Sequence, residues 1–276
     1  MTAQVLLLVL LAACIHATWN TWLKLAGDRL VAMSLMGGGW ALFAACWLPF
    51  LEFPSAQAWP YLAASVGVHL AYTLLLVPTY RLIDLSVAYP MFRGTAPIVV
   101  TLISVLWLGE AIGALGVFAV LLVTVGVVSL GWNRARGSYR ALLFGVLGGS
   151  LVAVYTLLDG IGARASYSAH GYAAWLFFLT GVPLLGTGIV LRRGQFVALA
   201  RPIALRGVGA GVIASTAFWI IIWALTQAPM GLVAAARETS VVFVALLSGM
   251  LLKETVSWLA IASVFVGVVL IRLAGA

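Results

Sequence analysis

Apolar residues fill most of this chain in long runs, and polar residues gather in short segments between those runs. A run of about 20 apolar residues is the length that an α-helix needs to cross the hydrocarbon core of a bilayer. The pattern predicts ten such spans, at residues 5–24, 31–50, 61–81, 86–108, 112–132, 141–163, 171–191, 204–226, 231–252 and 256–273. Little sequence remains between them, so we expect an all-α integral membrane protein.

Composition supports this interpretation and excludes a soluble enzyme. The 276 residues are 64% hydrophobic and only 8% charged, whereas a soluble domain is about a quarter charged. The net charge of +8 comes from basic residues scattered at the ends of spans. Membrane orientation explains that placement better than nucleic-acid binding does. The expected partners are therefore the lipid bilayer and a small-molecule substrate, with no nucleic acid.

The N-terminal apolar segment has two interpretations. Leu11–Cys14 resembles a lipoprotein cleavage box, but the positively charged start of a signal peptide is missing. The apolar stretch continues to Leu23, which is long enough to span, so we expect an uncleaved first helix. Cys14 and Cys46 both fall within predicted spans, and two cysteines provide no disulfide framework.

Two segments of the chain are copies of each other. Arg93–Glu110 and Arg237–Glu254 are identical at seven of 18 positions, with an offset of 144 residues. The offset is about half of the chain, so each half holds five spans, and an odd number of spans inverts one half relative to the other. The predicted fold is two inverted five-helix repeats, residues 1–132 and 141–276, around a central cavity, with residues 133–140 as the linker.

The loop charges predict an orientation. Eleven Lys and Arg residues lie in loops that follow odd-numbered spans, against two in the other loops and the tails. The basic side of a membrane protein is normally cytoplasmic. We therefore expect both termini on the periplasmic side of a bacterial inner membrane.

Several short motifs stand out along the predicted spans. They are Trp19-Asn20 followed by Lys24, Gly109-Glu110 and Lys253-Glu254 at the ends of the fourth and ninth spans, and Gly126 in the fifth span. With these motifs the chain resembles the drug/metabolite transporter superfamily, in its ten-helix EamA-like branch. The resemblance implies a transporter with a central cavity between two repeats, and export as the direction of flux. Substrates in the superfamily include amino acids, sugars, nucleotide derivatives and toxic organic compounds.

The match is looser at two points. Gly267 comes only 13 residues after Glu254, whereas Gly126 follows Glu110 by 16. The resemblance also implies cytoplasmic termini, which disagrees with the loop charges.

An arginine inside an apolar span is the first candidate for a functional residue. Arg93 lies well inside the fourth span, with Tyr89 one turn earlier on the same face. Pro97 removes the helical hydrogen bond to the carbonyl of residue 93, so we expect a kink there. Irregular backbone at this depth is tolerated where it is buried in protein or lines a wet cavity.

Arg237 is the counterpart of Arg93 in the second half, and Glu238 follows it. A guanidinium is suited to a carboxylate or phosphate, so one of the two arginines is expected to bind an anionic group of the substrate. The alternative is an internal ion pair with Glu238 or Asp159, since intramembrane charges commonly pair. Glu238 is also a candidate carrier of a coupling proton.

Polar and aromatic residues form stripes on several predicted spans, as expected of helices that line a ligand cavity. The candidates are His16, Trp19 and Asn20 in the first span, His69 and Tyr72 in the third, Tyr155 in the sixth, and Trp219 and Trp223 in the eighth. For any single tryptophan, lipid packing is the alternative.

The expected function is secondary transport of a small organic metabolite by alternating access, with an amino acid or related amphoteric solute as the preferred substrate. No metal-ligand spacing, phosphate-binding loop or nucleophilic arrangement occurs in the sequence, so we expect no cofactor and no catalytic residue. The rival functions are a scaffold subunit that transports nothing and a membrane enzyme acting on a lipid-linked substrate.

Overall fold

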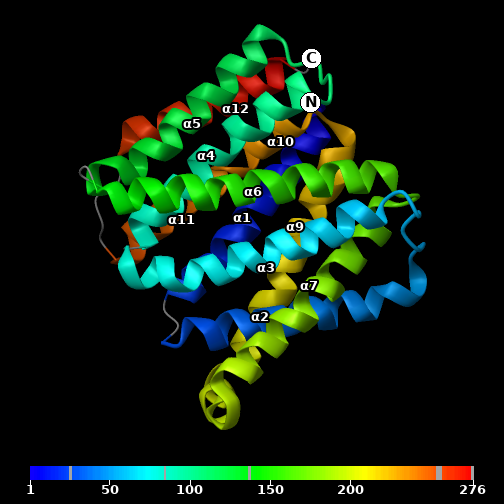
Figure 1. The fold of residues 1–276 in the computed structure, drawn as a ribbon. Helices are drawn as coiled ribbons and strands as arrows, with labels where there is room; N and C mark the ends of the chain where they lie inside the picture. The colour runs from blue at the N-terminus through cyan, green and yellow to red at the C-terminus, as the bar shows by residue number, and fades with distance from the viewer. Residues whose placement is uncertain (25–26, 84, 136–137, 253–256, 275–276) are drawn as a thin grey trace.

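The computed structural model describes residues 1–24, 27–83, 85–135, 138–252 and 257–274. The regular elements in these ranges are helices (Figure 1). In the first half they are α1 (Ala3–Lys24), α2 (Arg29–Trp47), the short η1 (Leu48–Phe50), α3 (Trp59–Leu82), α4 (Leu85–Leu106) and α5 (Ala114–Ala135). The all-α prediction is confirmed.

The second half contains more elements than the first. They are α6 (Tyr139–Ala165), α7 (Ala169–Arg192), the short η2 (Arg193–Gln195), α8 (Phe196–Ala200) and η3 (Arg201–Ile203), then α9 (Ala204–Gln227), α10 (Met230–Arg237), α11 (Thr239–Leu252) and α12 (Trp258–Ala274). Side-chain caps begin several of the long helices, because a Ser, Thr or Asp oxygen accepts an otherwise unpaired N–H of the first turn. The capping residues include Asp28 for α2, Ser138 for α6 and Ser168 for α7. Thr2 and Ser257 accept in the same way at the starts of α1 and α12.

One predicted span is not a continuous helix. Residues 231–252 divide into α10 and α11, and Glu238 lies at the break. The backbone there makes short-range bonds, with the N–H of Glu238 donating to Ala235 and the N–H of Val241 donating to Glu238. The Thr239 hydroxyl also donates to the carbonyl of Ala236, a local bond that competes with regular helix. Hydropathy reports the length of an apolar segment but not such local hydrogen bonds, so it did not predict this break.

Six segments of the described chain are long and apolar enough to cross a membrane. They are Arg29–Phe50, Trp59–Leu76, Tyr89–Leu106, Ala114–Trp132, Tyr139–Ala165 and Ala169–Gln227, the last of which contains both α7 and α9. Two shorter apolar helices, Ala3–Trp19 and Trp258–Ala274, accompany them. This is the architecture of a multi-pass membrane protein.

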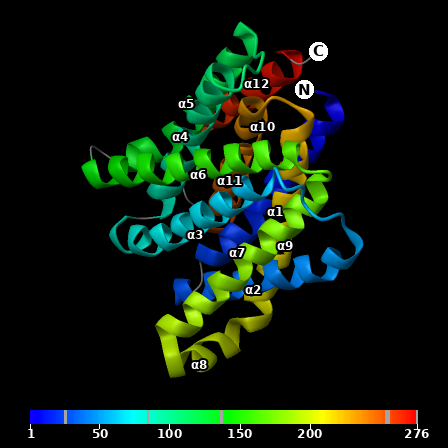
Figure 2. The same cartoon turned by 45° about the vertical axis from the view of Figure 1, so that its right-hand side comes forward.

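The helices form one bundle in which α6 crosses the middle, packed against α3 and α4 (Figures 1 and 2). Close approach depends on glycine: a Cβ on Gly149 of α6 would lie 2.9 Å from the carbonyl oxygen of Phe92 in α4. A Cβ on Gly211 of α9 would lie 2.2 Å from the carbonyl oxygen of Met36 in α2. Gly149 and Gly211 therefore lie on close-packing faces of α6 and α9. The start of α1 and the end of α12 lie near each other in Figures 1 and 2.

Candidate functional site

A cavity lies among six helices and has room for about 40 Å³ of water-sized molecules, which is enough for a few waters. Seven residues that the sequence marked as candidates line it: His16, Trp19, His69, Tyr72, Tyr89, Arg93 and Tyr155. The remaining lining residues are Met33, Met36, Trp40, Thr73, Leu76 and Phe218. The structure thus brings together residues from α1, α2, α3, α4, α6 and α9 around one predominantly aromatic wall.

Arg93 provides the positive charge at this wall. It is only 2% exposed, and its Nε lies 2.7 Å from Oε2 of Glu238. Its Nη2 donates to the Ser240 hydroxyl at 3.1 Å, and its guanidinium carbon lies 5.9 Å from the centre of the Tyr89 ring. Arg93 of α4 therefore reaches the break between α10 and α11. The helix α4 itself continues through both of its prolines, Pro90 and Pro97.

Two further buried charges lie behind Arg93. Glu238 is fully buried, and Arg237 is 3% exposed, with its Nε 3.8 Å from Glu238 Oε1. The guanidinium carbon of Arg237 lies 5.9 Å and 5.7 Å from the ring centres of Tyr155 and Phe218. Neither Arg237 nor Glu238 lines the cavity. The internal ion pair expected as an alternative is thus present, but Arg93 faces the cavity as well.

The charges in this cluster do not cancel. Two guanidinium groups surround one carboxylate, and the Nε atoms of both arginines and both oxygens of Glu238 are buried without an aligned hydrogen bond. A buried polar group left unpaired is costly, so it normally has a partner or a function. The distances are short enough for ion pairs. However, several donors and acceptors of these groups make no well-aligned hydrogen bond.

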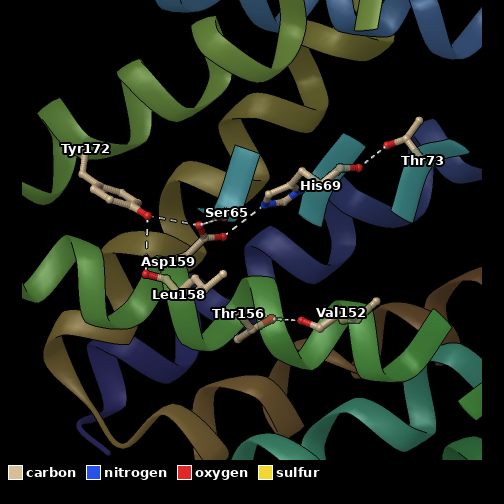
Figure 3. Close-up of polar contacts among 8 residues, drawn as sticks. All are labelled: Ser65, His69, Thr73, Val152, Thr156, Leu158, Asp159 and Tyr172. Carbon is tan, nitrogen blue, oxygen red and sulfur yellow. Dashed lines mark hydrogen bonds and ion pairs between the residues drawn. The ribbon is translucent and has the colours of Figure 1, made fainter. Parts of the chain in front are cut away.

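Asp159 forms a second buried polar centre, shown in Figure 3. The carboxylate is 2% exposed. It accepts hydrogen bonds from the Ser65 hydroxyl at 2.5 Å and the Tyr172 hydroxyl at 3.4 Å, both on Oδ1. Its Oδ2 lies 3.2 Å from Nε2 of His69. Asp159 of α6 therefore joins α3 and α7, and it does not pair with Arg93 or Arg237 as one sequence alternative proposed.

This arrangement differs from that of an activated nucleophile. A hydrolytic triad needs the serine hydroxyl to donate to the histidine, which then removes the proton. Here the Ser65 hydroxyl donates to the carboxylate of Asp159 instead. The presence of Ser65, His69 and Asp159 in one cluster therefore provides no general base for a nucleophile.

His69 connects the Asp159 cluster to the cavity. Its ring stacks on Tyr155, with ring centres 4.1 Å apart and an angle of 22° between the planes. Tyr155 in turn contacts Tyr72 edge-on at 5.8 Å. His69 thus lines the cavity, and its Nε2 contacts the buried carboxylate of Asp159.

Three sequence candidates lie elsewhere or outside the description. Trp219 does not line this cavity: its indole N–H donates to Nδ1 of His170 at 2.7 Å, and its ring packs against Phe43 and Trp47. Trp223 packs against the main apolar core and is likewise absent from the cavity lining. Asn20 belongs to α1, but its side chain is outside the described part of the chain.

The position of Phe218 explains why Trp219 does not line the cavity. Phe218 lines the cavity, and the next residue on the helix points about 100° away because a turn holds 3.6 residues. Met33, Met36 and Trp40 were also missed. Their spacing on α2 marks one helix face, but an apolar face toward a cavity and one toward lipid look alike in sequence. For Ser65, the usable signal was its position four residues before His69 on α3.

A polar clamp closes the bundle near the termini. Glu110 Oε1 lies 2.6 Å from Arg164 Nη1, and Glu110 Oε2 accepts the N–H of Met230 at 2.8 Å. Arg164 also donates to the carbonyls of Leu225 and Ala228. The clamp thereby ties the α4–α5 loop and the end of α6 to the α9–α10 loop. Glu254, which holds the corresponding place in the second half of the sequence, lies outside the described residues.

A second ion pair lies at another loop. Both Asp28 oxygens meet Arg192, at 2.8 Å and 3.2 Å. Burial alone would raise the pKa of Asp28, but hydrogen bonds from Arg192 and from the N–H of Val31 outweigh it and lower the pKa below its ordinary value. Asp28 therefore both begins α2 and holds it to the end of α7.

Known proteins resemble this chain at two levels. The family model described as Small Multidrug Resistance protein matches residues 42–123, which include α3 and α4 of the cavity wall. The Multidrug resistance protein mmr of Mycobacterium bovis is 33% identical over 74 residues, which are 27% of this chain and 69% of that relative. The Multidrug resistance protein Mmr of Mycobacterium tuberculosis matches with the same identity and coverage.

A solved structure, described only as the crystal structure of a protein, has the same fold. It superposes with a TM-score of 0.74 and covers 99% of this chain and 98% of its own, at 16% identity. That likeness concerns the fold alone. Because the sequence match covers more than two thirds of its relatives, this chain belongs to the small multidrug resistance family, within the drug/metabolite transporter-like superfamily.

Proposed function

We propose that this membrane transporter carries a small organic metabolite by alternating access, as an exporter or facilitator. One observation carries the proposal: a guanidinium lines an aromatic cavity inside a bundle of apolar helices. A charge at such depth is costly and is usually retained for function. A scaffold that transports nothing would gain nothing from a cavity beside Arg93.

The substrate is proposed to carry a carboxylate, and amino acids or related amphoteric solutes are the preferred class. A guanidinium has five N–H donors. The contacts with Glu238 and Ser240 involve Nε and one N–H of Nη2. The remaining N–H groups of Arg93 suit a carboxylate in the cavity, and the aromatic wall suits an apolar side chain.

The proposed architecture is the inverted repeat, residues 1–132 and 141–276, with 133–140 as the linker and ten spans in total. Helix contacts support it, because corresponding pairs recur in exchanged halves. The helix α3 packs on α6, and α1 packs on α9; likewise α4 packs on α6, and α1 packs on α11. In the proposed repeat, α1 corresponds to α6, α3 to α9, and α4 to α10 and α11. Each of these contacts therefore has a counterpart between the corresponding helices of the other repeat.

Paired glycines support the same symmetry. A Cβ on Gly37 of α2 would lie 3.0 Å from the Gly181 carbonyl, and one on Gly181 of α7 would lie 2.4 Å from the Gly37 carbonyl. Gly126 of α5 faces α12 in the same way as Gly267 of α12 faces α5. The aligned segment is 27% of this chain but 69% of its relatives, so those relatives are well under half as long. A duplicated ancestor of that size fits these observations.

The proposed orientation places the termini in the periplasm of a bacterial inner membrane, as the loop charges predict. Cavity residues such as Trp19, Met33 and Leu76 lie in those halves of their helices that are nearer the α1–α2 and α3–α4 loops. The clamp of Glu110 and Arg164 lies at the other ends of the helices. We therefore interpret this conformation as closed at the periplasmic side.

A multidrug transporter is the second candidate function, because the matching relatives are multidrug resistance proteins. An aromatic cavity also suits a flat organic cation, which the faces of Trp and Tyr attract. The positive cluster around Arg93 opposes a cation, which favours the first proposal. In both candidates Glu238 remains the proposed site of a coupling proton.

Transport by purified protein in proteoliposomes separates the candidates. We expect uptake of a radiolabelled amino acid from a mixed panel, and Arg93→Gln should reduce it at least tenfold by removing charge-assisted hydrogen bonds. Arg206→Gln is the matched control, because Arg206 is exposed and remote from the cavity. Transport of aromatic cations alone would favour the multidrug candidate. No transport of any amino acid, sugar, nucleotide or cation by folded protein would favour the scaffold.

A further inference from the structure

The Asp159 carboxylate lies next to the cavity with no cationic side chain beside it. Its described partners are the hydroxyls of Ser65 and Tyr172 and the ring of His69. Within the described ranges, no Lys or Arg contacts Asp159. The bundle therefore holds two separated centres of charge: a positive one at Arg93 and Arg237 with Glu238, and a negative one at Asp159.

The contact with Asp159 bears on the hydrogen-bonding character of His69. Oδ1 of Asp159 accepts from two hydroxyls, and with Oδ2 as an acceptor too, Nε2 of His69 is the nitrogen that carries the proton. In the neutral ring the other nitrogen, Nδ1, is then an acceptor. A carboxylate behind a histidine orients the ring and makes it a better acceptor, as it does in metal sites. His69 thus offers an acceptor at a wall where Arg93 offers donors.

We propose that the His69–Asp159 pair binds the ammonium group of the substrate, while Arg93 binds its carboxylate. The assignment rests on the proposed transport function and deepens it. Both His69 and Arg93 line the same cavity, and Tyr155 lies between the two centres, stacked on His69 and under Arg237. The ligand is therefore a zwitterion with its two charged groups on one end and an apolar side chain against the aromatic wall.

Each centre provides selectivity for one half of the zwitterion. An amine without a carboxylate leaves the donors of Arg93 unpaired, and an acid without an amine leaves the acceptor of His69 unpaired. A site with buried groups that expect a partner discriminates strongly against a ligand that lacks it. Asp159 does not line the cavity, so it acts through His69 as a positioning residue.

The test is competition between three compounds that share one side chain: phenylalanine, phenethylamine and 3-phenylpropionate. Each unlabelled compound competes with labelled phenylalanine for uptake into proteoliposomes. For the unaltered protein we expect phenylalanine to compete best. Asp159→Asn should reduce the preference for phenylalanine over phenylpropionate by about 10- to 100-fold, the range expected for a hydrogen bond to a charged group. Its preference over phenethylamine should stay.

Two further variants complete the design. Arg93→Gln should show the opposite pattern, losing the preference over phenethylamine and keeping that over phenylpropionate. Ser65→Ala is the matched control: it removes one donor to Oδ1 of Asp159 and leaves the His69 contact on Oδ2, so both preferences should persist. If Asp159→Asn is aggregated by size-exclusion chromatography, His69→Gln replaces it with the same expected loss.

The outcomes separate this inference from the transport proposal. An equal fall for all three compounds in Asp159→Asn means a structural role only and overturns the assignment. Uptake of phenylalanine with no preference over phenylpropionate in the unaltered protein also overturns it, while transport of a carboxylate stands. Transport of other solutes but of none of these three overturns the zwitterion site without touching the transporter.

Discussion

At the residue scale, the central feature is a pair of arginines that share one carboxylate. Glu238 lies 2.7 Å from Arg93 and 3.8 Å from Arg237, and all three side chains are buried. Two like charges in an apolar interior repel each other, so Glu238 is the group that allows both to remain. Its own burial is tolerated for the same reason, since removal of one partner of a buried pair is much worse than removal of both.

Glu238→Gln should therefore destabilise the protein by about 3–5 kcal/mol, because it leaves two buried cations without a counter-charge. The double variant Arg93→Gln/Glu238→Gln should lose less than the sum of the single variants. Thermal unfolding in detergent, followed by tryptophan fluorescence, measures both effects. Additive losses in the double variant would show that Arg93 and Glu238 do not stabilise each other.

At the element scale, glycine determines how closely the helices pack. The helix α9 approaches α2 where Gly211 faces the backbone of Met36 and Gly39. Two residues earlier on the same helix, Gly209 has open space around the position of a Cβ. The two glycines differ only in what they face, which makes them a matched pair.

Gly211→Ala should destabilise the protein by about 1–3 kcal/mol, because the added methyl meets backbone that cannot move aside as a side chain can. Gly209→Ala should be neutral or stabilising by up to about 1 kcal/mol, since alanine favours helix over glycine. Denaturation midpoints of the two variants in the same detergent decide this. Equal midpoints would contradict the helix contact.

At the scale of the whole molecule, one polar clamp joins segments from both halves of the chain. Glu110 follows α4, Arg164 ends α6, and their partners Leu225, Ala228 and Met230 flank the α9–α10 loop. The clamp combines an ion pair between Glu110 and Arg164 with hydrogen bonds between both side chains and the backbone around the α9–α10 loop. None of these residues lines the cavity, so the clamp does not contact a substrate bound there.

Glu110→Gln should open the bundle at this face, because the ion pair with Arg164 is lost and the N–H of Met230 loses a charged acceptor. We expect a cysteine introduced at Tyr155, in a chain with Cys14 and Cys46 changed to serine, to react faster with a membrane-impermeant maleimide added from the clamp side. The same cysteine with Glu110 intact is the control. An unchanged labelling rate would mean that the clamp does not limit access.

Much of the site was predictable because polar residues in apolar helices are rare. Arg93, His69 and Tyr155 stood out in sequence for that reason, and the structure places all three at one cavity. The Asp159–His69 contact was not predictable, since the residues lie 90 positions apart and no rule of spacing connects α3 to α6. Trp219 shows the opposite error: its helix contains polar neighbours, yet its ring faces the His170 side.

The sequence alone determined that the chain is an all-α membrane protein with a duplicated charged segment, because the cost of exposing polar groups to lipid acts on every residue locally. Only the tertiary structure decided which charges meet. Arg93 pairs with Glu238 and not with Asp159, and the span expected at 231–252 breaks between α10 and α11. The ion pair and the helix break depend on contacts between segments distant in the sequence, and hydropathy along the chain does not report such contacts.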